Sequence, residues 1–252
     1  MSMQFEIEII KALQNGRSDF WDFFFKYYSY IATIFTVIII AVILFLCKKR
    51  WSAFWFLVVE GAGYCSGFIL KHIISRDRPY IASSEVIAIT TTDGKSMPSG
   101  HSLCAIIMAM CLIYIFWENK KTWQRALMIA GGVTFFLLMG ISRMYLGQHY
   151  LSDVLVGYTL GYCVCLIAYW VRNPVARVVN MLLDSVGLSK WKMTVPPMPL
   201  VYDDMADNKV QKERESTHEA DASTPPAKNA NAKPSEKEKN IKNKGNDIGT
   251  RK

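Results

Sequence analysis

Residues 30–47 read YIATIFTVIIIAVILFLC, a run without a single charged side chain. A helix needs about 20 apolar residues to cross a bilayer, so this run is close to membrane-spanning length. Four further apolar blocks follow, at residues 52–70, 102–117, 126–141 and 151–171. The composition agrees, because 51% of the 252 residues are hydrophobic although the C-terminal part is polar. The blocks therefore predict a membrane protein that crosses the bilayer several times.

We expect an all-α fold, a polytopic membrane helical bundle with five to six spans. A soluble helical core is the alternative, since buried helices can also be apolar on all sides, but five such blocks with few internal charges argue against it. The N-terminal stretch is too short and too charged to span, and we expect it to form a helix along the membrane interface. Its apolar residues are Phe5, Ile7, Ile9, Ile10 and Leu13.

The basic residues predict the orientation of the chain. They concentrate after the first, third and fifth blocks, at Lys48, Lys49, Arg50, Lys120, Lys121, Arg125, Arg172 and Arg177. By the positive-inside rule these positions face the cytoplasm, and the C-terminal tail does too. The end of the second block, the start of the third, the end of the fourth and the start of the fifth then share the non-cytoplasmic face.

Three polar clusters lie at those four places. They are Lys71 with Arg78-Pro79, then Pro98-Ser99-Gly100-His101, then Ser142-Arg143 with His149 and Asp153. Cations can bind a phosphate, one histidine can attack it, a second can protonate the leaving group, and a carboxylate can orient the first. The three clusters together indicate a phosphoryl-transfer site.

Each cluster also has a plainer interpretation. Cations at a membrane boundary often anchor to lipid headgroups, and we favour this for Arg76. Lys71 and Arg78 differ, because they fall on the face where basic residues should be scarce.

Residues 98–101 could be an ordinary helix start. Pro suits the first helical turn, Ser can cap it, and the free amides could hold phosphate oxygens. His101 at that end could protonate a departing alkoxide. His149 and Asp153 are four residues apart, so on a helix they share a face.

Taken together, the clusters resemble the type 2 phosphatidic acid phosphatase family, membrane lipid phosphate phosphatases that share a core with vanadium haloperoxidases. The family pattern is Lys-x6-Arg-Pro, Pro-Ser-Gly-His and Ser-Arg-x5-His-x3-Asp, and the chain matches every position in order. Each motif alone would be weak, whereas three in register are specific. The resemblance covers about residues 5–171. Many members have six spans, whereas this chain shows five and an interfacial helix.

The resemblance implies a metal-independent phosphatase with a phosphohistidine intermediate and no cofactor. His149 would be the nucleophile, His101 the general acid and Asp153 the partner that orients His149. The residues around the phosphate would be Lys71, Arg78, Ser99, Gly100 and Arg143. The substrate would be a lipid phosphomonoester or diphosphate. Phosphatidate, a sphingoid-base phosphate, phosphatidylglycerophosphate and polyprenyl diphosphate all stay open.

We therefore divide the chain into four parts. These are an interfacial segment (1–28), a membrane catalytic domain (29–172), a juxtamembrane segment (173–195) and a disordered charged tail (196–252). The expected partners are the bilayer and the lipid substrate, with no nucleic acid. Plasma membrane and endoplasmic reticulum both stay open, as does the oligomeric state.

Three alternatives are a vanadate haloperoxidase, a non-enzymatic membrane scaffold or lipid-handling protein of the same fold, and metal-based hydrolysis. Two features stay ambiguous. Glu60 could face the substrate or have a structural role, and we favour the latter. The 81–97 loop could be a lid or only a connection.

Overall fold

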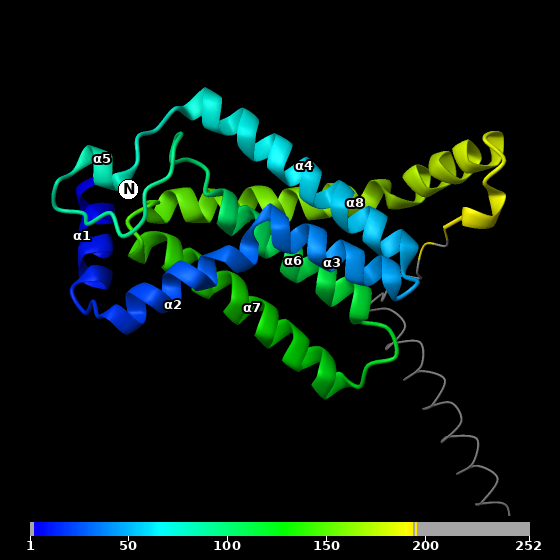
Figure 1. The fold of residues 1–252 in the computed structure, drawn as a ribbon, viewed down its shortest axis with the longest axis horizontal. Coiled ribbons are helices and arrows are strands. Elements are labelled where there is room, and N and C mark those ends of the chain that lie inside the picture. The colour runs from blue at the N-terminus through cyan, green and yellow to red at the C-terminus, as the bar shows by residue number, and fades with distance from the viewer. Residues whose placement is uncertain (1–2, 194, 196–252) are drawn as a thin grey trace, which may run out of the picture. The chain divides into compact units, whose positions relative to one another are not determined.

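The computed structural model describes residues 3–193 and 195, and every regular element within them is helical. In the chain order labelled in Figure 1, the elements are α1 (Met3–Gln14), α2 (Asp19–Ser29), η1 (Tyr30–Ala32), α3 (Ile34–Leu46), α4 (Arg50–Ile74), α5 (Pro79–Ala82), α6 (Gly100–Phe116), α7 (Thr122–Tyr145), α8 (Leu151–Ser185) and η2 (Ser189–Trp191). The expected all-α class is confirmed for the described residues. The predicted charged tail, residues 196–252, lies outside them.

Helix α6 lies at the centre of the bundle and packs against α4, α7 and α8. Every side chain from Ser102 to Ala109 is buried, as expected for a helix that is apolar on all sides. A Cβ at Gly161 of α8 would lie 2.5 Å from Ile106 Cγ2, so the missing side chain lets α8 approach α6 closely. Such small residues are the usual means of close helix packing in membranes. The N-terminal half of α6 is thus held between neighbouring helices.

Three helical segments of the described chain are long and apolar enough to cross a membrane: α4 continued by α5, then α7, then α8. A fourth is possible if α2, η1 and α3 form one bent span, while α6 is apolar but shorter. Large apolar side chains face outward, such as Phe35 and Trp170, which are 74% and 78% exposed. Such a surface suits lipid tails. The protein is an integral membrane protein, with fewer spans shown than the five to six expected.

The first apolar block does not form the single helix that residues 30–47 predicted. Residues Tyr30–Ala32 form a 3-10 turn, Thr33 is extended, and α3 begins only at Ile34. The axis of α3 differs by 53° from the axis of the helical stretch Asp19–Ala32 that precedes it. The hydroxyls of Thr33 and Thr36 donate to the Tyr30 carbonyl at 2.8 and 3.0 Å. Threonine side chains can compete for backbone groups in this way, which stabilises the break.

The last helix is longer than the fifth block predicted. The apolar pattern ends at residue 171, but α8 continues through Pro174 to Ser185. At 1.5 Å per residue, its 35 residues measure about 52 Å, more than the roughly 30 Å of a bilayer core. The predicted juxtamembrane segment therefore begins as a continuation of α8.

Helix α1 packs on α7 and α8 through one face. Ile7 and Ile10 of that face are buried with Tyr150 and Val154 in one apolar cluster. Gln14 binds the loop before α6, since its Nε2 donates to Ile87 O at 2.8 Å and its Oε1 accepts from Ile87 N at 3.0 Å. The N-terminal helix is therefore attached to the end of the bundle that carries the polar clusters.

Glu60 lies inside the bundle, 1% exposed, and its carboxyl group is close to Cys104 of α6. Neither carboxyl oxygen has a hydrogen-bond partner among the described residues. Within the described chain, Glu60 forms no hydrogen bond or ion pair with the residues of the three polar clusters. A structural role for Glu60 stays a prediction.

Candidate active site

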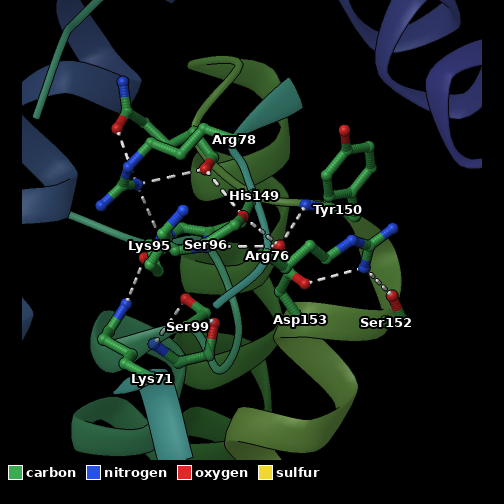
Figure 2. Close-up of polar contacts among 12 residues, drawn as sticks. Lys71, Arg76, Arg78, Lys95, Ser96, Ser99, His149, Tyr150, Ser152 and Asp153 are labelled. Carbon is green, nitrogen blue, oxygen red and sulfur yellow. Dashed lines mark hydrogen bonds and ion pairs between the residues drawn. The ribbon is translucent and has the colours of Figure 1, made fainter. Parts of the chain in front are cut away.

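The three polar clusters meet at one end of the bundle. The last turn of α4, the first turn of α6, the last turn of α7 and the first turn of α8 all contribute, as do the segments between them. Figure 2 shows Lys71, Arg78, Ser99, His149 and Asp153 gathered in one region. Sequence order alone spreads these residues over more than 80 positions, so the fold assembles them.

His149 lies in the turn between α7 and α8, and Asp153 lies in the first turn of α8. The expectation that one helix carries both was wrong, because α8 begins only at Leu151. The two still meet: His149 Nδ1 and Asp153 Oδ2 are 3.6 Å apart. The turn depends on Gly147, whose φ is +74° and whose Cβ would lie 2.5 Å from Ile87 O. Glycine alone tolerates both conditions.

The Asp153 carboxylate is held from several sides. Its Oδ2 accepts hydrogen bonds from the Tyr150 amide, at 2.9 Å, and from Ser96 Oγ. Ser96 Oγ also lies 3.4 Å from His149 Nδ1. One carboxylate oxygen is therefore fixed in front of the imidazole, so that it can accept the Nδ1 proton and leave Nε2 without one.

His149 is 2% exposed. Burial lowers the pKa of its imidazole to about 3, and the charges of Arg143 and Arg78 act in the same direction while Asp153 opposes them. The ring is therefore neutral at physiological pH. Its Nε2 lies 3.5 Å from Arg78 Nη1, so this nitrogen faces a cation rather than a carboxylate.

Lys71, Arg78 and Arg143 form no ion pair with any carboxylate in the described part of the chain. Arg78 donates to carbonyls instead, at 3.0 Å to Gly94 O and 3.2 Å to Gln148 O, and Lys71 donates to Lys95 O at 2.8 Å. Arg143 is 3% exposed, and its Nε has no hydrogen bond within the described residues. Arg78 and Arg143 are buried and Lys71 is partly buried. Buried cations without a carboxylate partner are costly, so this cluster is suited to an anion.

The 98–101 motif leads into α6, as predicted, but Pro98 precedes the N-cap and does not lie in the first helical turn as expected. Ser99 is the N-cap, and its Oγ accepts from the Ser102 amide at 3.4 Å. A Cβ at Gly100 would meet nothing within 4 Å, so the side of the helix start at Gly100 is open. The first amides of a helix lack intrahelical partners and favour anions. His101 lies within electrostatic range of Arg143 and His149.

Sequence reasoning missed two fully buried residues, Ser96 and Gln148. Ser96 contacts Asp153, and the Oε1 atom of Gln148 accepts from Arg78 Nη1 at 3.1 Å. Gln148 also bonds Thr90 and Thr92, so the 81–97 loop packs into the site and is more than a connection. Neither residue type carries a spacing signal, although Gln148 adjoins His149.

The interpretation of Arg76 as a lipid anchor was wrong. Its guanidinium donates to Asp153 Oδ1 at 2.9 Å and to Glu6 Oε2 at 2.7 Å. The positive-inside rule argues against an anchoring role for Arg76 as it does for Lys71 and Arg78, because all three fall where basic residues should be scarce.

A family model of the PAP2 superfamily matches residues 52–177, half of the chain. The chain belongs to the PAP2 superfamily. The match includes all eight predicted site residues, from Lys71 to Asp153.

Curated PAP2 relatives carry names of phosphatases. Phosphatidylglycerophosphatase B of Bacillus subtilis is 33% identical over 50% of this chain and 60% of its own length. Dolichyldiphosphatase of Saccharomyces cerevisiae is 24% identical over 53% of this chain and 54% of its own length. Lipid A 1-phosphatase of Porphyromonas gingivalis is 31% identical, over 34% of this chain and 18% of its own length. The chain thus spans less than two thirds of the length of these relatives.

Two solved structures share the fold. A PAP2-type phosphatidylglycerolphosphate phosphatase from Bacillus subtilis has a TM-score of 0.58 at 23% identity, over 68% of this chain and 86% of that one. Aquifex aeolicus LpxE has a TM-score of 0.56 at 23% identity, over 64% of this chain and 93% of that one. At this level of identity the likeness shows the PAP2 fold and not the activity.

The close approach of α8 to the PAP2 helix start gives a first prediction. A Cβ at Gly157 would lie 2.7 Å from Ser99 O, a backbone atom that cannot move alone. Gly157→Ala should therefore displace the Ser99 cap, lowering the melting temperature by several degrees and lowering the phosphatase activity that the resemblance implies by about 10-fold. Gly131→Ala in α7 is the matched control, because its Cβ would meet nothing within 4 Å. Equal effects of the two substitutions on both quantities would contradict the prediction.

The lowered pKa of His149 predicts a pH effect on stability. In the unfolded chain histidine binds a proton at its ordinary pKa of about 6.5, whereas the buried ring does so only near 3. Between these values the unfolded state holds the extra proton, so stability should fall as the pH falls from 6.5 toward 3. Asparagine does not bind a proton in this pH range, so His149→Asn should not show this loss of stability. From pH 7.5 to 5 the melting temperature of the wild type should drop further than that of the variant; equal drops would refute the assignment.

Proposed function

We propose that this protein is a membrane phosphatase that hydrolyses a lipid phosphomonoester or diphosphate through a phosphohistidine on His149, without a metal ion. One observation carries the proposal: the neutral His149 presents Nε2 to Arg78, one of three cations that have no carboxylate partner among the described residues. The PAP2 relatives named above support it, since each is named for removing phosphate from a lipid.

Phosphate binding is the role we assign to the cations. Lys71, Arg78 and Arg143 would neutralise the phosphate oxygens, and the first amides of α6, at Gly100 and His101, would add hydrogen bonds. Ser99 holds this helix start in place, because its amide donates to Asp153 O at 3.0 Å. The same groups would stabilise the charge that develops on the oxygens during transfer.

Transfer then follows in two steps. His149 Nε2 attacks phosphorus and the bond from phosphorus to the leaving-group oxygen breaks. His101, which takes up a proton when the negative charge of the substrate phosphate binds beside it, gives that proton to the leaving oxygen. Asp153 accepts the Nδ1 proton of His149 in a hydrogen bond and stabilises the charged ring. In the second step His101 takes a proton from water, the hydroxide attacks phosphorus, and the phosphorus–nitrogen bond breaks. Inorganic phosphate leaves and His149 is neutral again.

For the membrane arrangement we propose five spans formed by α3, α4, α6, α7 and α8, with α1 at the interface. The active site then faces the non-cytoplasmic side and the tail faces the cytoplasm, as the distribution of basic residues favours. A cysteine placed at exposed Lys120 should react with a membrane-impermeant maleimide only after the cells are permeabilised.

Phosphate release from purified protein tests the activity. The panel should contain phosphatidate, a sphingoid-base phosphate, phosphatidylglycerophosphate and a polyprenyl diphosphate, each assayed with and without EDTA. We expect release from at least one lipid in EDTA, with loss in a His149 variant. No release from any lipid would favour the scaffold alternative, and release abolished by EDTA would favour metal-based hydrolysis.

A further inference from the structure

Arg76 bridges two carboxylates at the edge of the proposed site. One amino group, Nη1, binds Asp153 Oδ1 at 2.9 Å and Ser152 Oγ at 2.6 Å; the other, Nη2, binds Glu6 Oε2 at 2.7 Å. The guanidinium also lies over the Tyr150 ring, 3.7 Å from its centroid. Figure 2 shows Arg76 on the side of Asp153 away from Arg78. Arg76 thus contacts the carboxylate and not the space where phosphate would bind.

Glu6 reaches this network from α1, about 70 residues away in the sequence. It is 2% exposed, and its second oxygen accepts from the Ser152 amide at 2.7 Å. Burial alone would raise the pKa of Glu6, but the hydrogen bonds from Ser152 and Arg76 outweigh it and lower the pKa. The carboxylate is therefore charged at neutral pH and holds the start of α8 and Arg76 together.

The two oxygens of Asp153 have separate partners. Oδ2 accepts from the Tyr150 amide and faces His149, whereas Oδ1 binds Arg76. A carboxylate held at only one oxygen can rotate about its last bond, and an ion pair at the other oxygen prevents this. Arg76 in turn keeps its place because Glu6 binds it from the opposite side.

We propose that Arg76 and Glu6 are positioning residues that hold Asp153 toward His149, so that the N-terminal helix α1 is part of the catalytic apparatus. The inference rests on the proposed roles of His149 and Asp153. Partners that orient a catalytic ligand from behind affect activity by about 10- to 100-fold when removed, as seen at metal sites. A similar range is expected here.

The test measures kcat and KM for lipid phosphate hydrolysis in full-length variants. Arg76→Gln should lower kcat about 10- to 100-fold with KM within about 3-fold of wild type. Glu6→Gln keeps the side-chain shape and should lower kcat about 3- to 10-fold. Arg76→Lys should recover part of the loss, because an ammonium can reach one carboxylate but does not bridge both. The double variant should be no slower than Arg76→Gln, because the two residues act as one unit.

The control is Lys11→Gln. It removes an exposed ion pair between Lys11 of α1 and Glu85 of the 81–97 loop. It should leave kcat unchanged. Wild-type kcat in Glu6→Gln and Arg76→Gln, additive losses in the double variant, or a change in KM alone would each overturn the inference. If Arg76→Gln does not fold, the kcat values of Glu6→Gln and Arg76→Lys test the inference instead.

The proposed function can fail separately. A wild-type protein that needs His149 but tolerates both Glu6→Gln and Arg76→Gln contradicts only the positioning role. A wild-type protein that releases no phosphate, or a His149 variant that keeps its activity, contradicts the proposed function and the inference together.

Discussion

Replacing His149 by alanine is expected to lower kcat/KM for lipid phosphate hydrolysis by about 10³-fold or more. The cation cluster would still bind phosphate, but the imidazole nitrogen that faces Arg78 would be gone. The imidazole is buried with Nδ1 toward Asp153 and Nε2 toward Arg78, an arrangement that alanine removes entirely. Inorganic phosphate released from detergent-solubilised lipid measures the effect, with and without EDTA.

The control for this substitution is His72→Ala. His72 is exposed on α4, where its Nδ1 lies 2.9 Å from Phe68 O and its ring packs on Phe68. Neither contact involves a residue of the proposed site, so its variant should keep wild-type activity. A His149→Ala protein that folds and retains more than about a tenth of the activity would rule out nucleophilic catalysis by this residue.

Arg143→Met is expected to inactivate the protein while raising its melting temperature. The guanidinium is 3% exposed, has no ion pair among the described residues and leaves Nε without a partner. A buried charge without compensation destabilises a fold, and an apolar side chain of similar length removes that cost. Activity should fall about 10²- to 10³-fold, as for the loss of one donor to a developing oxyanion. The melting temperature should rise by a few degrees.

Arg17→Met serves as the comparison for Arg143. Arg17 is paired with Asp22 at 2.6 Å near the surface, so its substitution should leave activity unchanged and should not raise the melting temperature. If Arg143→Met melts below the wild type, or keeps its activity, Arg143 has a structural role and its assignment to phosphate binding is wrong.

Part of this arrangement could be predicted from local patterns. Apolar blocks gave the positions of α4, α7 and α8, because helices in a bilayer must be apolar over their length. Counting those blocks placed Lys71, His101, Arg143 and Asp153 at one end of the bundle, where the structure has them. The Ser99 cap was also predictable, since N-capping depends only on neighbouring residues.

The remaining features depend on contacts between distant segments. Glu6 meets Arg76, and Ser96 meets Asp153, only after the helices pack. No periodicity or spacing encodes such pairs. The break at Thr33 was missed because apolar composition does not distinguish one straight helix from two bent ones. The length of α8 was missed because hydropathy reports the part in lipid and not the helix beyond it.

The most direct measurement is to trap the covalent intermediate. The protein is mixed with a ³²P-labelled lipid phosphate in EDTA, quenched within milliseconds to seconds in base, and digested for peptide mapping. The account predicts a radiolabelled peptide that contains His149, with label that is stable in base and lost in acid, as for a phosphorus–nitrogen bond. Label on another residue, or turnover without labelled protein and in need of a divalent metal, would contradict it.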